Sequence, residues 1–135
     1  MSKTAKEIVT SFYETDLIHT PEAFSEYLHP EVQLDWTSSF GFRKKNLEDI
    51  KMLFEGMSTS FETLRCEISH LVSEKSMVTL RGSYIARLIE NPEKEEVIAH
   101  CMAIWELKDD KLYRGYMISQ HGDNSKESLA SFLSK

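Results

Sequence analysis

Histidines and cysteines are the side chains of this sequence that most readily bind metals, carry protons or act as nucleophiles. The five histidines are spread along the chain, at His19, His29, His70, His100 and His121. None pairs with another as H-x-H or H-x-x-x-H, and no carboxylate stands at a supporting spacing, so we expect no metal site. His121 closes the last predicted strand, and it is the histidine to be tested as a proton carrier.

The two cysteines, Cys66 and Cys101, lie on predicted strands that are not neighbours, so we expect two small buried groups and no disulfide. Two cysteines are too few for a disulfide-rich scaffold and predict a reducing compartment. The opening MSKTAKEIV contains no apolar segment, so we expect a cytoplasmic protein. The patterns G-x-G-x-x-G, G-x-x-x-x-G-K and G-x-S-x-G are absent, so we expect no nucleotide cofactor and no serine-hydrolase chemistry.

Composition limits the partners that this chain can have. Its 135 residues predict a single domain over 1–135, and 41% hydrophobic with 28% charged residues allow a real core. A net charge of −6 disfavours nucleic acid, because phosphate binding needs a positive face. No apolar run approaches the roughly 18 residues of a membrane span, so we expect no membrane partner.

Helical patterns come first in the sequence. Thr4 and Glu7 form a predicted capping box, and apolar residues at helical spacing predict a helix over 5–18. Thr20-Pro21 is the predicted start of a second helix, which is expected to end at Pro30.

Apolar and polar residues alternate within 32–36, which predicts a short strand with one buried face. Residues 38–42 are expected to form a loop with two aromatic side chains. Asn46 is then the predicted cap of a third helix. The buried stripe of this helix is Leu47, Ile50, Leu53, Phe54 and Met57.

Strand patterns follow the helices, which is typical of an α+β fold. Short turns connect four long alternating segments, so we expect an antiparallel meander. The segments are 62–72, 77–90, 96–107 and 112–121. The C-terminal tail, 123–135, is expected to be a short helix docked on the sheet or a frayed end.

Three segments resemble the NTF2-like superfamily, and most of all its SnoaL-like branch. They are Tyr27-Leu28-His29-Pro30-Glu31-Val32, the stretch Gly41 to Ile50, and the stretch Ile104 to Leu112. The resemblance covers roughly residues 5–121 and implies an NTF2-like cone, in which three N-terminal helices pack inside a curved antiparallel sheet. The family includes isomerases, cyclases, hydrolases and non-enzymes, so the fold says little about function.

The resemblance also implies where catalysis would occur. The ketosteroid isomerase and polyketide cyclase branches use a pocket carboxylate as base and a tyrosine in an oxyanion hole. Tyr13 falls near the family's helical tyrosine, although it could equally be a core-edge tyrosine. Asp35 falls near the family's carboxylate, but a shift of one residue would turn it outward and put Trp36 there. The other family acids map onto Ala103 and near Met117, which cannot titrate. The candidate catalytic residues are therefore Tyr13, Asp35 and His121.

Large apolar side chains on the inner faces either line a cavity or pack a solid core. Small residues on neighbouring strands, such as Gly82, Ala99 and Gly115, favour a cavity because they leave volume. The predicted ligand-binding residues are Phe12, Tyr13, Trp36, Phe40, Phe54, Met57, Tyr84, Cys101, Ala103, Trp105, Met117 and Ser119.

The opposite, convex face of the sheet is predicted to carry an apolar patch of Met102, Ile104, Tyr116 and Ile118. Exposed patches of this kind usually mean association, so the expected partner is a second copy of the chain in a homodimer. The run Arg43-Lys44-Lys45 is either a solvated loop or the entry site of an anionic ligand.

Two functions remain open at this point. The first is a dimeric module that binds a small apolar molecule or another protein and lacks the family's usual catalytic acids. The second is an isomerase, cyclase or hydrolase that acts on a small hydrophobic ligand by acid–base catalysis. Nuclear-transport activity is a third reading that only the fold supports. Asp35 or His121 within hydrogen-bond reach of Tyr13 would favour the enzyme, and a cavity plugged by Trp36 and Trp105 would favour the module.

Overall fold

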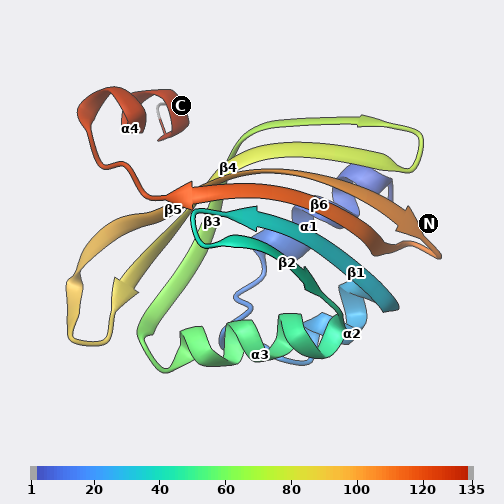
Figure 1. Ribbon diagram of the computed structural model, residues 1–135, viewed down its shortest axis with the longest axis horizontal. Coiled ribbons are helices and arrows are strands. Elements are labelled where there is room, and N and C mark those ends of the chain that lie inside the picture. The colour runs from blue at the N-terminus through green and yellow to red at the C-terminus, as the bar shows by residue number, and fades with distance from the viewer. Residues whose placement is uncertain (1–2, 134–135) are drawn as a thin grey trace.

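A computed structural model describes residues 3–133 and shows the α+β cone that was expected (Figure 1). A long curved sheet wraps around the first helix, and two further helices close one side of the cone. The described residues form α1 (Ala5–Glu14), α2 (Ala23–Tyr27), β1 (Leu28–Ser38), β2 (Gly41–Lys45), α3 (Leu47–Ser58), β3 (Phe61–Glu74), β4 (Met77–Leu88), β5 (Asn91–Lys108), β6 (Lys111–His121) and α4 (Lys126–Leu133).

The six strands form one sheet in the order β2-β1-β6-β5-β4-β3. Strands β3 to β6 pair with their neighbours in antiparallel fashion, which confirms the predicted meander. β1 extends the sheet beyond β6 and runs parallel to it. The prediction of a loop over 38–42 was wrong, because Gly41–Lys45 pairs with β1 as the edge strand β2. Arg43, Lys44 and Lys45 therefore lie on an edge strand rather than in a loop.

Local signals set the starts of the first and third helices. Thr4 and Glu7 form the predicted capping box, with the Glu7 N–H donating to Thr4 Oγ1 over 3.1 Å and the Thr4 N–H donating to Glu7 Oε1 over 2.8 Å. Asn46 and Asp49 form the same arrangement at α3. α1 ends at Glu14 rather than at residue 18, because Thr15 adopts an extended backbone conformation.

The second helix and the first strand differ from their predicted bounds. α2 covers only Ala23–Tyr27, and β1 begins immediately afterwards at Leu28. Pro30 lies inside β1, in the stretch between Leu28 and Gln33 where the register with β6 shifts. A proline is tolerated there because the ladder does not need its missing N–H.

The concave face of the sheet and the helices share one hydrophobic core. α1 contributes its whole apolar stripe, and Val9 is fully buried. From the sheet, Val78, Leu80, Ala103, Trp105 and Leu112 are each buried to 97% or more. Because α1 lies inside the curve of the sheet, its side chains meet side chains from β3 and β4.

The C-terminal helix α4 packs on the convex side of the sheet, and the last two residues of the predicted tail, 134–135, lie outside the described residues. The Phe132 ring stacks on the His100 ring at 4.1 Å, and the Arg81 guanidinium lies 3.6 Å from the centre of the Phe132 ring. His100, on the convex face as expected, is buried there, and its Nδ1 is 2.8 Å from Ser83 Oγ. No helix within residues 3–133 is long and apolar enough to cross a membrane.

Candidate functional site

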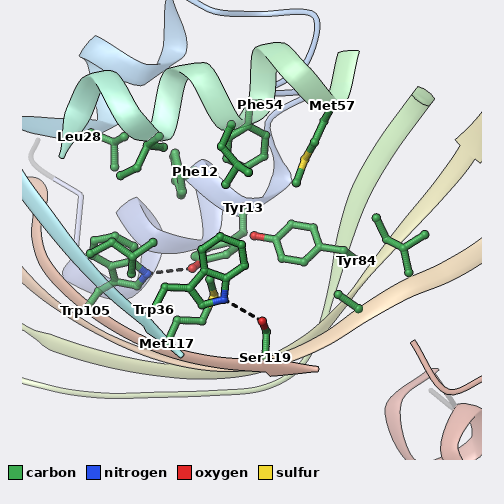
Figure 2. Close-up of a pocket in the computed structure, with 15 residues that line it drawn as sticks. Phe12, Tyr13, Leu28, Trp36, Phe54, Met57, Tyr84, Trp105, Met117 and Ser119 are labelled. Carbon is green, nitrogen blue, oxygen red and sulfur yellow. Dashed lines mark hydrogen bonds between the residues drawn. The ribbon is translucent and has the colours of Figure 1, made fainter. Parts of the chain in front are cut away.

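A buried pocket of about 100 Å³ lies between α1, α3 and the concave face of the sheet (Figure 2). Its walls are almost entirely apolar and come from α1, α3 and four of the strands. The lining residues are Phe12, Tyr13, Leu28, Leu34, Trp36, Ile50, Leu53, Phe54, Met57, Tyr84, Ile98, Ala99, Trp105, Met117 and Ser119. A concave apolar space with a few polar groups is the usual form of a small-molecule site.

The pocket is small because the Trp105 ring fills the space left by the missing side chain of Gly115. A Cβ atom added at Gly115 would lie 2.6 Å from the Trp105 ring, so the indole packs directly against the β6 backbone. At Gly82 an added Cβ would meet the Glu67 carbonyl oxygen at 2.8 Å. Neither glycine leaves empty volume in the cone, and the cavity forms beside the Trp105 ring instead.

Two indole N–H groups are fixed by hydrogen bonds inside the pocket (Figure 2). Trp105 Nε1 donates to the Tyr13 hydroxyl over 2.8 Å, and both side chains are buried. Trp36 Nε1 donates to Ser119 Oγ over 2.7 Å. These bonds join α1 to β5 and β1 to β6, so they hold the two large rings in place from opposite walls.

The Tyr84 hydroxyl is the polar group of the lining that is left without a partner. Its side chain points toward the middle of the pocket in Figure 2, and its oxygen makes no hydrogen bond with any residue in 3–133. No fully buried side-chain oxygen or nitrogen in these residues lacks a partner, so the Tyr84 oxygen must face accessible space. A ligand in the pocket is therefore a natural partner for this hydroxyl.

Both pocket tyrosines remain protonated over the physiological range. Burial raises the pKa of Tyr13 and of Tyr84 well above the ordinary value, and each is raised further by nearby groups that would also be negative. The pKa of Cys101 is likewise raised by burial, to about 11. The two hydroxyls therefore act as neutral hydrogen-bond donors and not as bases.

The candidate catalytic residues are not brought together. Tyr13 lines the pocket, but its oxygen already accepts the Trp105 N–H. The Asp35 side chain lies on the other face of β1 from Leu34 and Trp36, which line the pocket. Its partners on the neighbouring strands are Lys44 of β2 and Tyr116 of β6. His121 is exposed at the end of β6, where its ring meets Phe40 edge-on at 5.1 Å.

The predicted ligand-binding residues divide into two groups. Those that line the pocket are Phe12, Tyr13, Trp36, Phe54, Met57, Tyr84, Trp105, Met117 and Ser119. Cys101 and Ala103 are buried outside the lining, and Phe40 is 73% exposed at the β1–β2 turn.

The lining also contains residues that the ligand-binding prediction left out. Ile50 and Leu53 were expected only as part of the buried stripe of the third helix. Ile98 could not be found by alternation, because Tyr84 pairs with Ala99 while Ile85 pairs with Val97, which leaves Ile98 as the extra residue of a bulge. Such a bulge changes the face that the following residues occupy.

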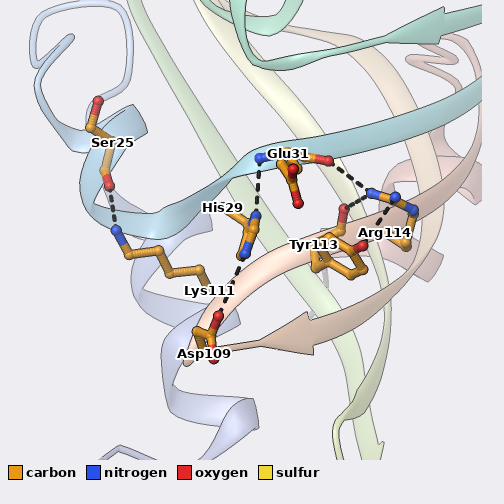
Figure 3. Close-up of polar contacts among 7 residues, drawn as sticks. All are labelled: Ser25, His29, Glu31, Asp109, Lys111, Tyr113 and Arg114. Atoms are coloured by element: carbon orange, nitrogen blue, oxygen red, sulfur yellow. Dashed lines mark hydrogen bonds and ion pairs between the residues drawn. The ribbon is translucent and has the colours of Figure 1, made fainter.

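A second polar cluster lies outside the pocket and fastens the start of β1 to the turn between β5 and β6 (Figure 3). His29 Nδ1 accepts the Glu31 N–H over 3.0 Å, and its Nε2 lies 3.6 Å from Asp109 Oδ2. The Arg114 guanidinium donates to the Glu31 carbonyl over 2.8 Å and covers the Tyr113 ring at 4.0 Å. These groups are already paired with one another, so the cluster is structural. Within 3–133 no three metal-binding side chains converge.

Comparisons with known proteins agree with this architecture. Residues 9–115 match the model of the SnoaL-like domain. IdmH from Streptomyces antibioticus, a proposed polyketide cyclase, superposes with a TM-score of 0.69 at 12% identity, over 87% of this chain and 92% of its own. A proposed polyketide cyclase from Acidithiobacillus ferrooxidans gives 0.66 at 18% identity, over 88% and 89%.

An NTF2-like protein of unknown function from Cytophaga hutchinsonii gives a TM-score of 0.59 at 9% identity, over 86% of this chain and 99% of its own. No curated protein matches the chain. At these identities the solved structures show the fold alone. The family model covers most of the sequence, and the chain therefore belongs to the SnoaL-like domain family, with an NTF2-like fold.

Proposed function

We propose that this protein binds a compact, uncharged, largely apolar molecule that carries one hydrogen-bonding group. The observation that carries the proposal is the unpartnered Tyr84 hydroxyl inside an otherwise apolar pocket. A ketone or alcohol oxygen would satisfy it, and the Tyr13 hydroxyl still has its own proton to donate. A pocket of about 100 Å³ takes at most a single ring or a short chain, because it is smaller than the apolar cavity of about 150 Å³ that binds benzene.

The chemistry of the lining supports binding rather than proton abstraction. The lining contains no carboxylate, imidazole or amine, and its two tyrosines stay protonated. A base that removes a proton from carbon must be within hydrogen-bond reach of it, and neither Asp35 nor His121 lines the pocket. The acid–base enzyme of the second hypothesis would need a base from elsewhere.

Tryptophan fluorescence is the direct assay, because the two tryptophans of the chain, Trp36 and Trp105, both line the pocket. Acetophenone and ethylbenzene form a matched pair that differs in the carbonyl oxygen. We expect both to change the fluorescence, and we expect Tyr84→Phe to weaken only acetophenone, by about threefold to tenfold for one hydrogen bond. Phe40→Ala, at an exposed position outside the lining, is the control variant.

Two results would contradict the binding proposal. One is the absence of any fluorescence or thermal-stability change with either compound, and the other is equal weakening of both by Tyr84→Phe. Proton exchange tests the enzyme separately. If acetophenone loses deuterium from its methyl group faster with the protein than without it, and Tyr13→Phe abolishes this rate, acid–base catalysis replaces simple binding as the function.

We also propose that two copies associate through the convex face of the sheet. Met102 pairs with Ile118 and Ile104 pairs with Tyr116, so these four side chains form one continuous patch. Each is substantially exposed, from 39% for Ile104 to 69% for Ile118. An apolar patch in the middle of a sheet is a typical surface for self-association.

Sedimentation velocity tests this association. We expect a dimer for the natural chain and a monomer for Ile118→Glu, because the substitution places a charge in the centre of the patch. Ile89→Glu is the matched control, since Ile89 is 53% exposed on the β4–β5 turn, away from the patch. A monomeric natural chain at micromolar concentration, or equal dissociation by both substitutions, would contradict the dimer.

A further inference from the structure

A second hollow lies outside the buried pocket, between the end of α1 and strand β3. It is a surface cleft of about 420 Å³. Its lining is Tyr13, Glu14, Thr15, Asp16, Thr63, Leu64, Arg65 and Cys66. In contrast with the pocket, this cleft is partly polar, since it contains two threonines and three charged side chains.

A third, much smaller space, which we call the neck, shares lining residues with both the pocket and the cleft. The neck is about 10 Å³ in volume, and its lining residues are Tyr13, Thr15, Leu17, Phe54, Leu64, Arg65, Cys66 and Tyr84. It shares Tyr13, Phe54 and Tyr84 with the pocket, and Tyr13 and Cys66 are among those it shares with the cleft. A space of this volume holds about one water molecule, so the neck is too narrow for a ring.

We propose that the ligand extends through this neck. Its compact apolar end fills the pocket, an unbranched chain passes Tyr13, Tyr84 and Cys66, and a polar end lies in the cleft. This inference rests on the proposed binding function and adds the shape and the polarity of the ligand.

The volumes support an extended ligand. The buried pocket alone is smaller than the roughly 300–1,000 Å³ of ordinary small-molecule sites. The cleft, at about 420 Å³, brings the combined site into that range. The free Tyr84 hydroxyl lines both the pocket and the neck, which is the place where a chain oxygen would pass.

The charges of the cleft favour a neutral polar end such as a hydroxyl group. Arg65 is already held by Glu95, through two hydrogen bonds of 3.0 and 3.1 Å. With that guanidinium paired, the Glu14 carboxylate disfavours an anionic end, while the Asp16 carboxylate is already paired with His19 over 2.7 Å. The Thr15 hydroxyl already donates to the Ser11 carbonyl over 2.6 Å and can accept a hydrogen bond from an alcohol, while the Thr63 hydroxyl can donate or accept one.

Cys66 makes the inference measurable, because its thiol lines the neck and the cleft but not the pocket. The probes are benzyl alcohol, which is short enough for the pocket alone, and 6-phenylhexan-1-ol, whose chain reaches beyond the ring. Alkylation of each cysteine by iodoacetamide is followed by mass spectrometry. The pKa of Cys66 is raised by burial, so the reaction is run at mildly alkaline pH.

We expect both alcohols to change the tryptophan fluorescence, and only the longer one to protect Cys66. At about 90% occupancy, protection by a bound chain slows alkylation about tenfold, while benzyl alcohol at equal occupancy has little effect. Cys101, which is buried and lines none of the three spaces, is the internal control for unfolding, because its thiol reacts only when the core opens.

The outcomes separate this inference from the proposed function. In one contrary result, both alcohols change the fluorescence and neither protects Cys66, and in another, both protect it equally. Either result would overturn the extended ligand and leave the pocket proposal standing. No fluorescence change with either alcohol would overturn both. Cys66→Leu gives a second measurement, because a larger side chain should fill the neck. We expect this variant to lose 6-phenylhexan-1-ol and to keep benzyl alcohol, and unchanged binding of both would overturn the inference.

Discussion

Removing one hydroxyl from each pocket tyrosine should have very different effects on stability. Tyr13→Phe deletes the acceptor of the Trp105 indole N–H, at a place where Tyr13 is 5% and Trp105 3% exposed. A buried donor left without a partner costs about 1–3 kcal/mol, so we expect Tyr13→Phe to lower the free energy of unfolding by about that amount.

Tyr84→Phe is the matched comparison, because its hydroxyl makes no hydrogen bond within residues 3–133. We expect its free energy of unfolding to change by less than about 0.5 kcal/mol, the range of substitutions that remove no interaction. The two variants lose the same oxygen atom from the same residue type in the same pocket. Their difference therefore isolates the bond to Trp105.

Urea unfolding followed by far-UV circular dichroism measures both variants. With a slope of about 1–3 kcal/mol per molar urea, the expected loss moves the midpoint of Tyr13→Phe by about 0.3–3 M. Adding Trp105→Phe completes a double-mutant cycle, in which this substitution should cost less in the Tyr13→Phe background than in the natural chain, because it also removes the unpaired N–H. Equal unfolding free energies for Tyr13→Phe and Tyr84→Phe, or strictly additive effects in the cycle, would refute the reasoning.

Three further predictions concern the packing, the caps and the pH dependence. Gly115→Ala should destabilise the protein by about 1–3 kcal/mol in the same urea assay, because its Cβ would lie 2.6 Å from the Trp105 ring; a neutral effect would show that the ring moves freely. Asn46→Ala should cost about 1 kcal/mol by removing the cap that accepts the Asp49 N–H over 2.9 Å, and Asn46→Asp should restore most of it. Burial raises the pKa of Cys101 from 9.0 to about 11, so its contribution to stability is complete below pH 9 and is lost as the pH rises through about 11. Cys101→Ala should therefore flatten the fall in stability between pH 8 and pH 11, and an unchanged slope would contradict this assignment.

The parts of the fold that depend on short-range chemistry could be predicted from the sequence. The caps at Thr4 and Asn46 need only a partner three residues away, and both are present. Strand β2 could not be predicted, because its pairing depends on β1 and its own residues are exposed on both faces. A single exposed edge strand carries no hydrophobic alternation for a sequence pattern to detect.

The pocket shows the same division between local pattern and long-range geometry. Alternation placed Trp36, Tyr84 and Met117 on the inner face, and these residues line the pocket. It could not anticipate Ile98, because the bulge depends on the register between β4 and β5. Alternation also could not show that the Trp105 ring fills the space above Gly115, because this contact joins residues of two different strands.

The position of β2 also limits how copies of this chain can aggregate. A sheet edge offers unpaired N–H and C=O groups to any other edge strand, and two such strands would lie about 5 Å apart. Here each β2 would bring Arg43, Lys44 and Lys45 against the same three cations of its neighbour. The mutual repulsion disfavours pairing of two copies through this border, so the backbone groups of the edge stay in water.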